Sequence, residues 1–245
     1  MGVYTRPSIV TNGLVLNLDA ANIKSYPGSG TTWSDLSGNK LNGTLTNNTY
    51  NTLGGGNISF NGTNSVVGLG DSDLFSFTSG GGVDLPFSIC IWTKVVVDGM
   101  LLAKSQYNGS WIREWTLSVN SSGIVSALLF KSDSSAYLLR SSISSITTNT
   151  WNYLSITYDG TKNSSGIKIY INGVLQSTSD GSSGIYNGMT NTSVTLEFGR
   201  QYNTGGANNY LNGNISNVLI YRNKELTATE VLQNYNALKS RFNLS

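Results

Sequence analysis

Residues 167–176 carry the clearest alternation of apolar and polar positions in the chain. Ile167, Ile169 and Ile171 are separated by single residues, and the run ends at the pair Asn172-Gly173 before apolar residues resume. Asn and Gly tolerate the positive φ that both central residues of a type I′ turn require. The pattern therefore predicts a β-hairpin with one face toward a core and the other toward water.

Short runs of the same kind recur along the chain and are separated by turns rich in Gly, Asn, Asp and Ser. They lie at residues 14–19, 58–60, 64–69, 87–97, 101–104, 115–119, 124–130, 137–140, 151–158, 194–199 and 215–221. About a dozen short strands at regular turn spacing are typical of an all-β sandwich.

The C-terminal segment changes from strand periodicity to helical periodicity. Thr227 and Glu230 have the spacing of a capping box, in which each residue satisfies a backbone N–H at the start of a helix. Apolar residues then recur at helical spacing from Val231 to Leu238. We therefore expect one short helix at residues 227–242.

Size and composition favour a single folded domain. A chain of 245 residues fits one sandwich, and charged residues make up only 11% of it. Five Trp, thirteen Tyr and many aliphatic runs supply a core despite the abundance of turn residues. We expect an N-terminal extended arm at residues 1–11, where Pro7 fixes φ, and one β-sandwich at residues 12–245.

Charge and reactive side chains exclude several classes of function. The net charge is +2 without a Lys/Arg cluster, so we expect no nucleic-acid partner. No apolar run approaches the roughly 18–20 residues that span a bilayer, so we expect no membrane insertion. The chain has no histidine, which excludes Ser-His and Cys-His nucleophiles and His-ligated zinc. Cys90 is the single cysteine, and we expect it to be buried and inert.

Several motifs in a fixed order resemble a known family. They lie at residues 33–39, 60–64, 151–160, 167–176, 197–200 and 211–221. Together they are similar to laminin-G-like domains of the concanavalin A-like lectin/glucanase superfamily, over residues 14–235 or so. The resemblance implies an antiparallel jelly-roll sandwich of two sheets, concanavalin A-like, with one short C-terminal helix.

The segment 234–242 is similar to the ends of laminin-G-like proteins encoded by tailed phages. This resemblance implies a non-enzymatic virion surface protein, a capsid decoration or fibre/adhesion protein that presents rim loops to glycans or a host surface. Capsid or other virion proteins, or sister copies in a homo-oligomer, would dock on residues 1–11 or on the C-terminal helix. The first residues lack the apolar run of a signal peptide, which fits virion assembly in the host cytoplasm. Two alternatives stay open: a stand-alone carbohydrate-binding module and a purely structural capsid cement protein.

The carboxylates give no sign of glycosidase chemistry. Glucanases of this fold use a Glu-x-Asp-x-x-Glu strand pattern, in which two carboxylates act as nucleophile and general acid. None of the four glutamates Glu114, Glu197, Glu225 and Glu230 stands in such a pattern. We therefore expect no catalytic residues, and a retaining glycosidase is the enzyme-class alternative.

Two glycine-containing loops combine the aromatic and amide groups that a sugar site needs. The loops span residues 106–113 and 201–210, and a jelly roll can bring them to one rim. The candidate carbohydrate-binding residues are Tyr107, Trp111, Arg113, Tyr202, Asn203, Asn209 and Tyr210. The alternative is that these side chains cover loop backbone or contact a neighbouring protein.

Calcium is the one cofactor that the residue types suggest, because it takes carboxylate and amide oxygens and needs no His or Cys. Asp35, Ser37 and Asn39 follow an Asp-x-Ser-x-Asn spacing near a glycine. By family resemblance we favour Asp19, Asp35 and Asn39 as its ligands. The alternative is a loop stabilised by Asx-turns, in which Asp and Asn side chains bind nearby backbone N–H groups.

Overall fold

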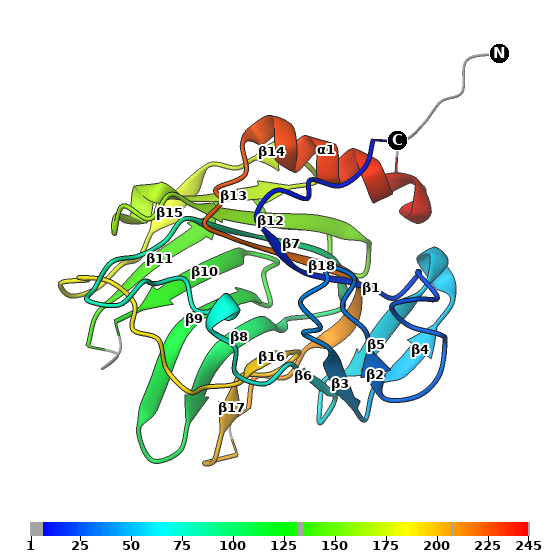
Figure 1. Ribbon diagram of the computed structural model, residues 1–245, viewed down its shortest axis with the longest axis horizontal. Coiled ribbons are helices and arrows are strands. Elements are labelled where there is room, and N and C mark those ends of the chain that lie inside the picture. Colours follow the sequence, from blue (N-terminus) through cyan, green and yellow to red (C-terminus); the bar gives the residue numbers. More distant parts are fainter. Residues whose placement is uncertain (1–6, 132–134, 207, 245) are drawn as a thin grey trace.

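Two sheets of mostly antiparallel strands face each other in the computed structural model, which describes residues 7–131, 135–206 and 208–244 (Figure 1). The first sheet has the order β14-β13-β12-β7-β18-β5-β4, and β1 also pairs with β18. Its strands are β1 (Leu14–Asp19), β4 (Thr49–Asn51), β5 (Asn57–Asn61), β7 (Phe87–Val95), β12 (Asn152–Tyr158), β13 (Ile167–Ile171), β14 (Val174–Leu175) and β18 (Asn212–Arg222).

The second sheet has the order β15-β11-β10-β9-β8-β16-β6-β3-β2, and β17 pairs in parallel with β8. Its strands are β2 (Thr32–Trp33), β3 (Gly43–Thr46), β6 (Val66–Gly68), β8 (Gly99–Tyr107), β9 (Trp111–Val119), β10 (Val125–Phe130), β11 (Tyr137–Ser142), β15 (Thr178–Asp180), β16 (Leu196–Phe198) and β17 (Tyr202–Asn203). One helix, α1 (Ala228–Leu238), and four short 3₁₀ turns complete the elements of the described ranges. The turns are η1 (Leu53–Gly55), η2 (Asp73–Phe75), η3 (Ser164–Gly166) and η4 (Lys239–Phe242). The predicted all-β sandwich of two sheets with one short C-terminal helix is confirmed.

The hairpin predicted from residues 167–176 forms as expected. Asn172 and Gly173 have φ of 52° and 81°, and Ile171 pairs with Val174 across the turn. Ile169 is fully buried in the core between the sheets. The alternation therefore predicted both the turn and the inward face.

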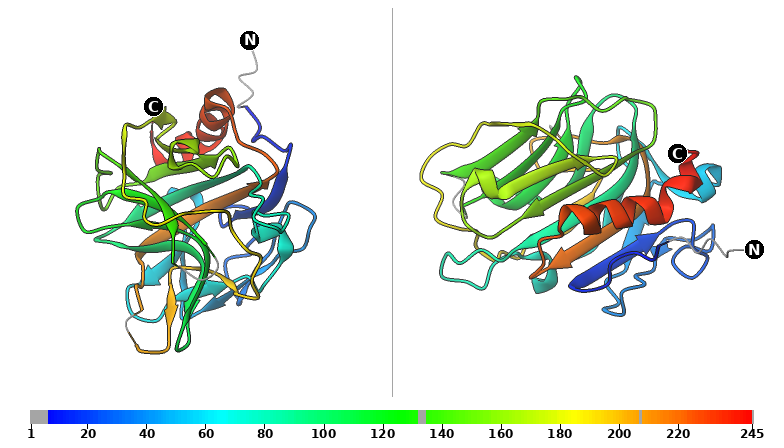
Figure 2. Two further views of the ribbon diagram at one scale, coloured as in Figure 1. Left: turned by 90° about the vertical axis from the view of Figure 1, so that its left-hand side faces the viewer. Right: turned by 90° about the horizontal axis from the view of Figure 1, so that it is seen from above.

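The outer face of this hairpin is covered at Tyr170, which corrects the expectation of a solvated face drawn from the alternation. Tyr170 is only 3% exposed, because helix α1 (Ala228–Leu238) packs across the outer face of the first sheet (Figures 1 and 2). A second apolar cluster, separate from the core between the sheets, lies between this helix and the sheet and includes Trp92, Tyr153 and Tyr235. An alternating strand pattern shows that a strand has two faces, but it does not show what covers the second face.

Helix α1 begins at the predicted capping box. The Thr227 hydroxyl accepts the Glu230 N–H at 3.3 Å, and the Glu230 carboxylate accepts the Thr227 N–H at 2.9 Å. Beneath the helix Cys90 is buried, and burial raises the pKa of its thiol, as expected of an inert cysteine. Within the described ranges, no helix is both long and apolar enough to cross a membrane.

A buried polar network fixes the N-terminal segment beside the helix (Figure 2). The Asn234 side chain is fully buried, accepts the Val10 N–H at 2.8 Å and donates to the Tyr221 hydroxyl at 3.0 Å. That hydroxyl donates to the Val10 carbonyl at 2.9 Å. Both backbone groups of Val10 are therefore satisfied. Residues 1–6 of the expected arm lie outside the described residues.

Candidate functional site

The first predicted loop is mostly strand. β8 continues to Tyr107 and β9 starts at Trp111, so the turn between them is only residues 108–110. The apolar runs predict a strand that ends at residue 104 and a next strand that begins at residue 115, because polar side chains interrupt the apolar pattern between them. The two strands keep pairing past the core and project from the sandwich, next to β17 (Figure 1).

The structure brings the second loop against this projecting hairpin. Tyr202 and Asn203 form β17 and pair with Gln106 and Tyr107 at the end of β8. The Gln201 side-chain amide also donates to the Ser105 hydroxyl at 2.7 Å. The two candidate loops therefore lie side by side and form one surface.

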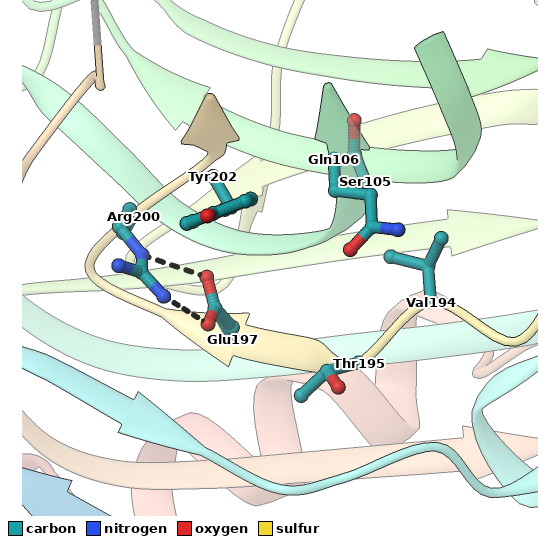
Figure 3. Close-up of a pocket in the computed structure, with 7 residues that line it drawn as sticks. All are labelled: Ser105, Gln106, Val194, Thr195, Glu197, Arg200 and Tyr202. Carbon is teal, nitrogen blue, oxygen red and sulfur yellow. Dashed lines mark hydrogen bonds and ion pairs between the residues drawn. The ribbon is translucent and has the colours of Figure 1, made fainter. Parts of the chain in front are cut away.

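A small hollow opens between β8, β16 and the start of β17, with a volume of about 170 Å³. This is smaller than the roughly 300–1,000 Å³ of typical small-molecule sites, which suits one sugar unit better than a chain. Amide, hydroxyl, carboxylate and guanidinium groups surround it (Figure 3). The lining residues are Ser105, Gln106, Val194, Thr195, Glu197, Arg200 and Tyr202.

Glu197 and Arg200 form the charged wall of the hollow. The guanidinium binds both carboxylate oxygens, with Nε donating to Oε2 at 2.9 Å and a second hydrogen bond reaching Oε1 (Figure 3). Gly199 makes the fold-back possible, because its φ is +80° and an added Cβ would lie 2.3 Å from the Phe60 ring. A bidentate pair of this kind is rigid, so both groups present fixed donors and acceptors.

Tyr202 and Tyr210 of the second loop lie at the hollow and beside its charged wall. Tyr202 is 36% exposed, and the Arg200 guanidinium lies 4.8 Å from its ring centroid. Burial alone would lower the pKa of the Arg200 guanidinium. Its interactions with Glu197 and Tyr210 have the opposite and larger effect, so the pKa of Arg200 is raised. Tyr210 therefore lies near this wall, whereas Asn209 is exposed beside it.

Tyr107, Trp111 and Arg113 form a second group on the hairpin. The rings of Tyr107 and Trp111 are 5.1 Å apart between centroids. The Arg113 guanidinium lies 4.0 Å from the Trp111 ring centroid, so it occupies one face of that ring. That face of Trp111 is therefore not available to stack on a sugar.

Sequence reasoning missed Gln106, Glu197 and Arg200 as site residues. Glu197 and Arg200 were noted only as part of a family motif, although their three-residue spacing around a glycine is compatible with an ion pair across a turn. Gln106 precedes the candidate residue Tyr107, and nothing in the local sequence indicates that its own side chain belongs to a site. The pairing of β17 with β8 is what brings the three together.

A buried charge cluster supports the wall formed by Val194 and Thr195. The Lys104 ammonium lies 2.9 Å from a carboxylate oxygen of Glu114 and 2.9 Å from one of Asp71. It also donates to the Val194 carbonyl at 2.8 Å, while Glu114 accepts the Thr192 N–H at 2.8 Å. Lys104 and Glu114 are both fully buried, so this cluster anchors the segment that borders the hollow.

The proposed calcium ligands do not fit the ion. Both carboxylate oxygens of Asp19 bind the Arg241 guanidinium, at 2.7 and 2.9 Å. The Asp35 carboxylate accepts N–H groups of Asn17, Ser37 and Leu41 at 2.8–3.2 Å, which is an Asx-type arrangement. No cluster of three or more His, Cys, Asp or Glu side chains suited to a metal occurs in the part of the chain that the structure describes.

Adding calcium is therefore expected to leave the Tm unchanged within about 1 °C, because Asp19 already has a cationic partner. Thermal unfolding with calcium and with a chelator measures this directly. A rise of several degrees that the chelator reverses would show that calcium binds the folded protein after all.

The fold and this hollow can be compared with known proteins. A sequence model described as the concanavalin A-like lectin/glucanases superfamily matches residues 60–232. No curated protein matches the chain in sequence.

Solved structures share the fold at low sequence identity. A mutant Trypanosoma rangeli sialidase with trans-sialidase activity aligns with a TM-score of 0.66 and 15% identity, over 96% of this chain and 34% of that chain. The binding domain of botulinum neurotoxin DC, in complex with rat synaptotagmin II, aligns with a TM-score of 0.65 and 18% identity, over 94% and 52%. A structure of botulinum neurotoxin type C, which depends on two ganglioside molecules to enter cells, gives the same values. The chain spans about a third to a half of these neighbours, and the likeness shows the fold alone.

Proposed function

The chain belongs to the concanavalin A-like lectin/glucanases superfamily, and on that premise we propose that it is a non-enzymatic surface protein that binds glycans through its rim. The observation that carries the proposal is the hollow beside β17, where Tyr202 is exposed next to Gln106 and the Glu197–Arg200 pair. An aromatic plane beside fixed polar groups is what a sugar needs, because its C–H face stacks and its hydroxyls form hydrogen bonds.

A binding role is supported over hydrolysis by the charges at the hollow. Both retaining and inverting glycosidases use a pair of carboxyl groups flanking the scissile bond. Of the seven lining residues, Glu197 alone carries a carboxylate, and Arg200 binds both of its oxygens. A carboxylate held in this way is suited to accept hydroxyl donors and is a poor nucleophile or general acid.

A glycan partner also agrees with the ganglioside dependence of one structural neighbour, the type C neurotoxin. Single sites of this size bind weakly, and many copies on one particle multiply the effective affinity. We further propose that the protein lies on the surface of a phage particle, as a decoration or adhesion protein, where many copies would provide this gain. Residues 7–11 and helix α1 lie side by side and offer one attachment surface away from the β8–β9 hairpin (Figure 2).

Imaging purified particles at side-chain resolution tests the virion role. We expect copies docked through residues 7–11 or the helix, with the rim outward. Absence of the protein from the particles would overturn the virion role and leave a stand-alone carbohydrate-binding module.

Tyr202→Ala is expected to weaken glycan affinity about 10-fold, because losing the aromatic plane removes roughly 1–1.5 kcal/mol of stacking. Tyr202→Phe keeps the ring and should stay within about 2-fold of the native protein. Isothermal titration calorimetry with a glycan found on an array measures both. Equal binding by native protein and Tyr202→Ala would remove the hollow as the site.

A further inference from the structure

The Arg113 guanidinium lies over two aromatic rings, those of Trp111 and Phe130. Its guanidinium carbon lies 4.0 Å from the Trp111 centroid and 4.6 Å from the Phe130 centroid. These cation–π contacts stabilise the guanidinium through the ring faces and leave its N–H donors as the groups that can hydrogen-bond a ligand.

The charge of Arg113 has no counter-ion among the described residues. Arg200, Arg241 and Lys104 each lie within ion-pair distance of a carboxylate, whereas no described carboxylate pairs with Arg113. Its Nε is buried without a hydrogen-bond partner in the same residues. Burial lowers the pKa of the Arg113 guanidinium, partly offset by Tyr137. A partly desolvated cation without a partner is costly, and an incoming anion would remove part of that cost.

Strand pairing places this charge next to the proposed glycan site. Arg113 is paired with Ser105, and Trp111 with Tyr107, so these four side chains share one face of the β8–β9 hairpin. Ser105 lines the hollow, and Tyr107 is the pairing partner of Asn203 in β17. Gln106 and Tyr202 pair with each other and lie on the opposite face of the sheet. A ligand in the hollow would therefore approach Arg113 across Ser105, the lining residue that shares its face.

We propose that the rim site selects glycans that carry a carboxylate, and that Arg113 is the residue that recognises it. This inference rests on the proposed function and adds the class of sugar. A guanidinium edge matches the two oxygens of a planar carboxylate with parallel N–H···O hydrogen bonds. A uronic acid and a sialic acid both supply that group, and neutral sugars supply none.

Calorimetry on the full chain with three probes tests this selection. The probes are sialyllactose, an oligosaccharide of uronic acids, and lactose as the neutral control. We expect one acidic probe to bind at least about 10-fold more tightly than lactose, since hydrogen bonds between charged groups are about twice as strong as neutral ones. Which acidic probe binds identifies the sugar.

Two variants and one modified probe separate charge from geometry. Arg113→Gln should lose that preference, so that the acidic probe binds no more than about 2-fold more tightly than lactose to the same variant. Arg113→Lys keeps the charge without the planar fork and should recover only part of the preference. The methyl ester of the acidic probe, tested on the native protein, should bind like lactose, which keeps the test valid if a variant fails to fold.

The outcomes distinguish the two proposals. Equal binding of acidic and neutral probes, unchanged by Arg113→Gln, would overturn the carboxylate selection while glycan binding stands. Failure of the native protein to bind any of the probes or any array glycan would overturn the proposed function itself.

Discussion

Replacing Lys104 with methionine is expected to lower the free energy of unfolding by about 3–5 kcal/mol, the cost of breaking a buried ion pair on one side. Glu114 would keep its charge while fully buried, and its Oε2 already lacks a hydrogen-bond partner within the described residues. The Thr192 and Val194 carbonyls would also lose their shared donor. For a chain of this size, that loss lowers the Tm by roughly 10 °C.

The double variant Lys104→Met/Glu114→Leu is the matched control, because it removes both charges. Replacing a buried pair by apolar residues is often close to neutral, so we expect the double variant to recover part of the lost Tm. Chemical denaturation of the four proteins in this cycle gives the coupling energy. A Lys104→Met protein that melts within about 2 °C of the native one would show that the pair does not hold the fold. Because Val194 borders the hollow, Lys104→Met should also weaken glycan binding.

Asp84→Ala is expected to cost about 3 kcal/mol or more, because three donors lose one buried carboxylate. The hydroxyls of Tyr158 and Tyr186 donate to it at 2.9 and 2.7 Å, and the Met189 N–H donates at 2.7 Å. Desolvation, followed by the Asp84 charge, raises the pKa of both tyrosines, so both remain protonated donors at neutral pH. Asp84 thus ties the segment around residues 186–189 to the core.

Limited proteolysis and thermal unfolding together test this role. Asp84→Ala should make the chain susceptible to cleavage near residues 186–189. Asp84→Asn keeps an acceptor oxygen, so its cleavage rate and its Tm should lie between those of Asp84→Ala and the native protein. If Asp84→Ala resists proteolysis as well as the native protein does, contacts other than those of Asp84 hold this segment in place. The rim hollow is lined by other residues, so glycan binding by the folded Asp84→Ala protein should persist.

The local parts of the fold could be predicted from the sequence. The hairpin depends on Asn172 and Gly173, and the helix start depends on Thr227 and Glu230, so each signal lies within a few neighbouring residues. The burial of Tyr170 could not be predicted in the same way. It depends on a helix that follows in the chain only after five further strands.

The candidate site follows the same rule. Its aromatic loops were visible in the sequence because Tyr, Asn and Gly gather there, and the structure brings the two loops together. The Lys104 cluster was not visible, because Asp71 and Val194 lie 33 and 90 positions away in the chain. The spacing of Asp35, Ser37 and Asn39 suggested an ion, but in the structure Asp35 serves backbone N–H groups. Local sequence patterns therefore indicate which residue types gather at a site, but they do not indicate which groups those side chains bind in the folded protein.

A crystal structure of the protein with the glycan that binds it most tightly on an array tests the proposed site most directly. We expect a sugar in the hollow, stacked on Tyr202 and hydrogen-bonded to Gln106 or Glu197, with any carboxylate bound by Arg113. A sugar bound elsewhere on the sandwich, or an array on which no glycan is bound, would contradict the proposed site.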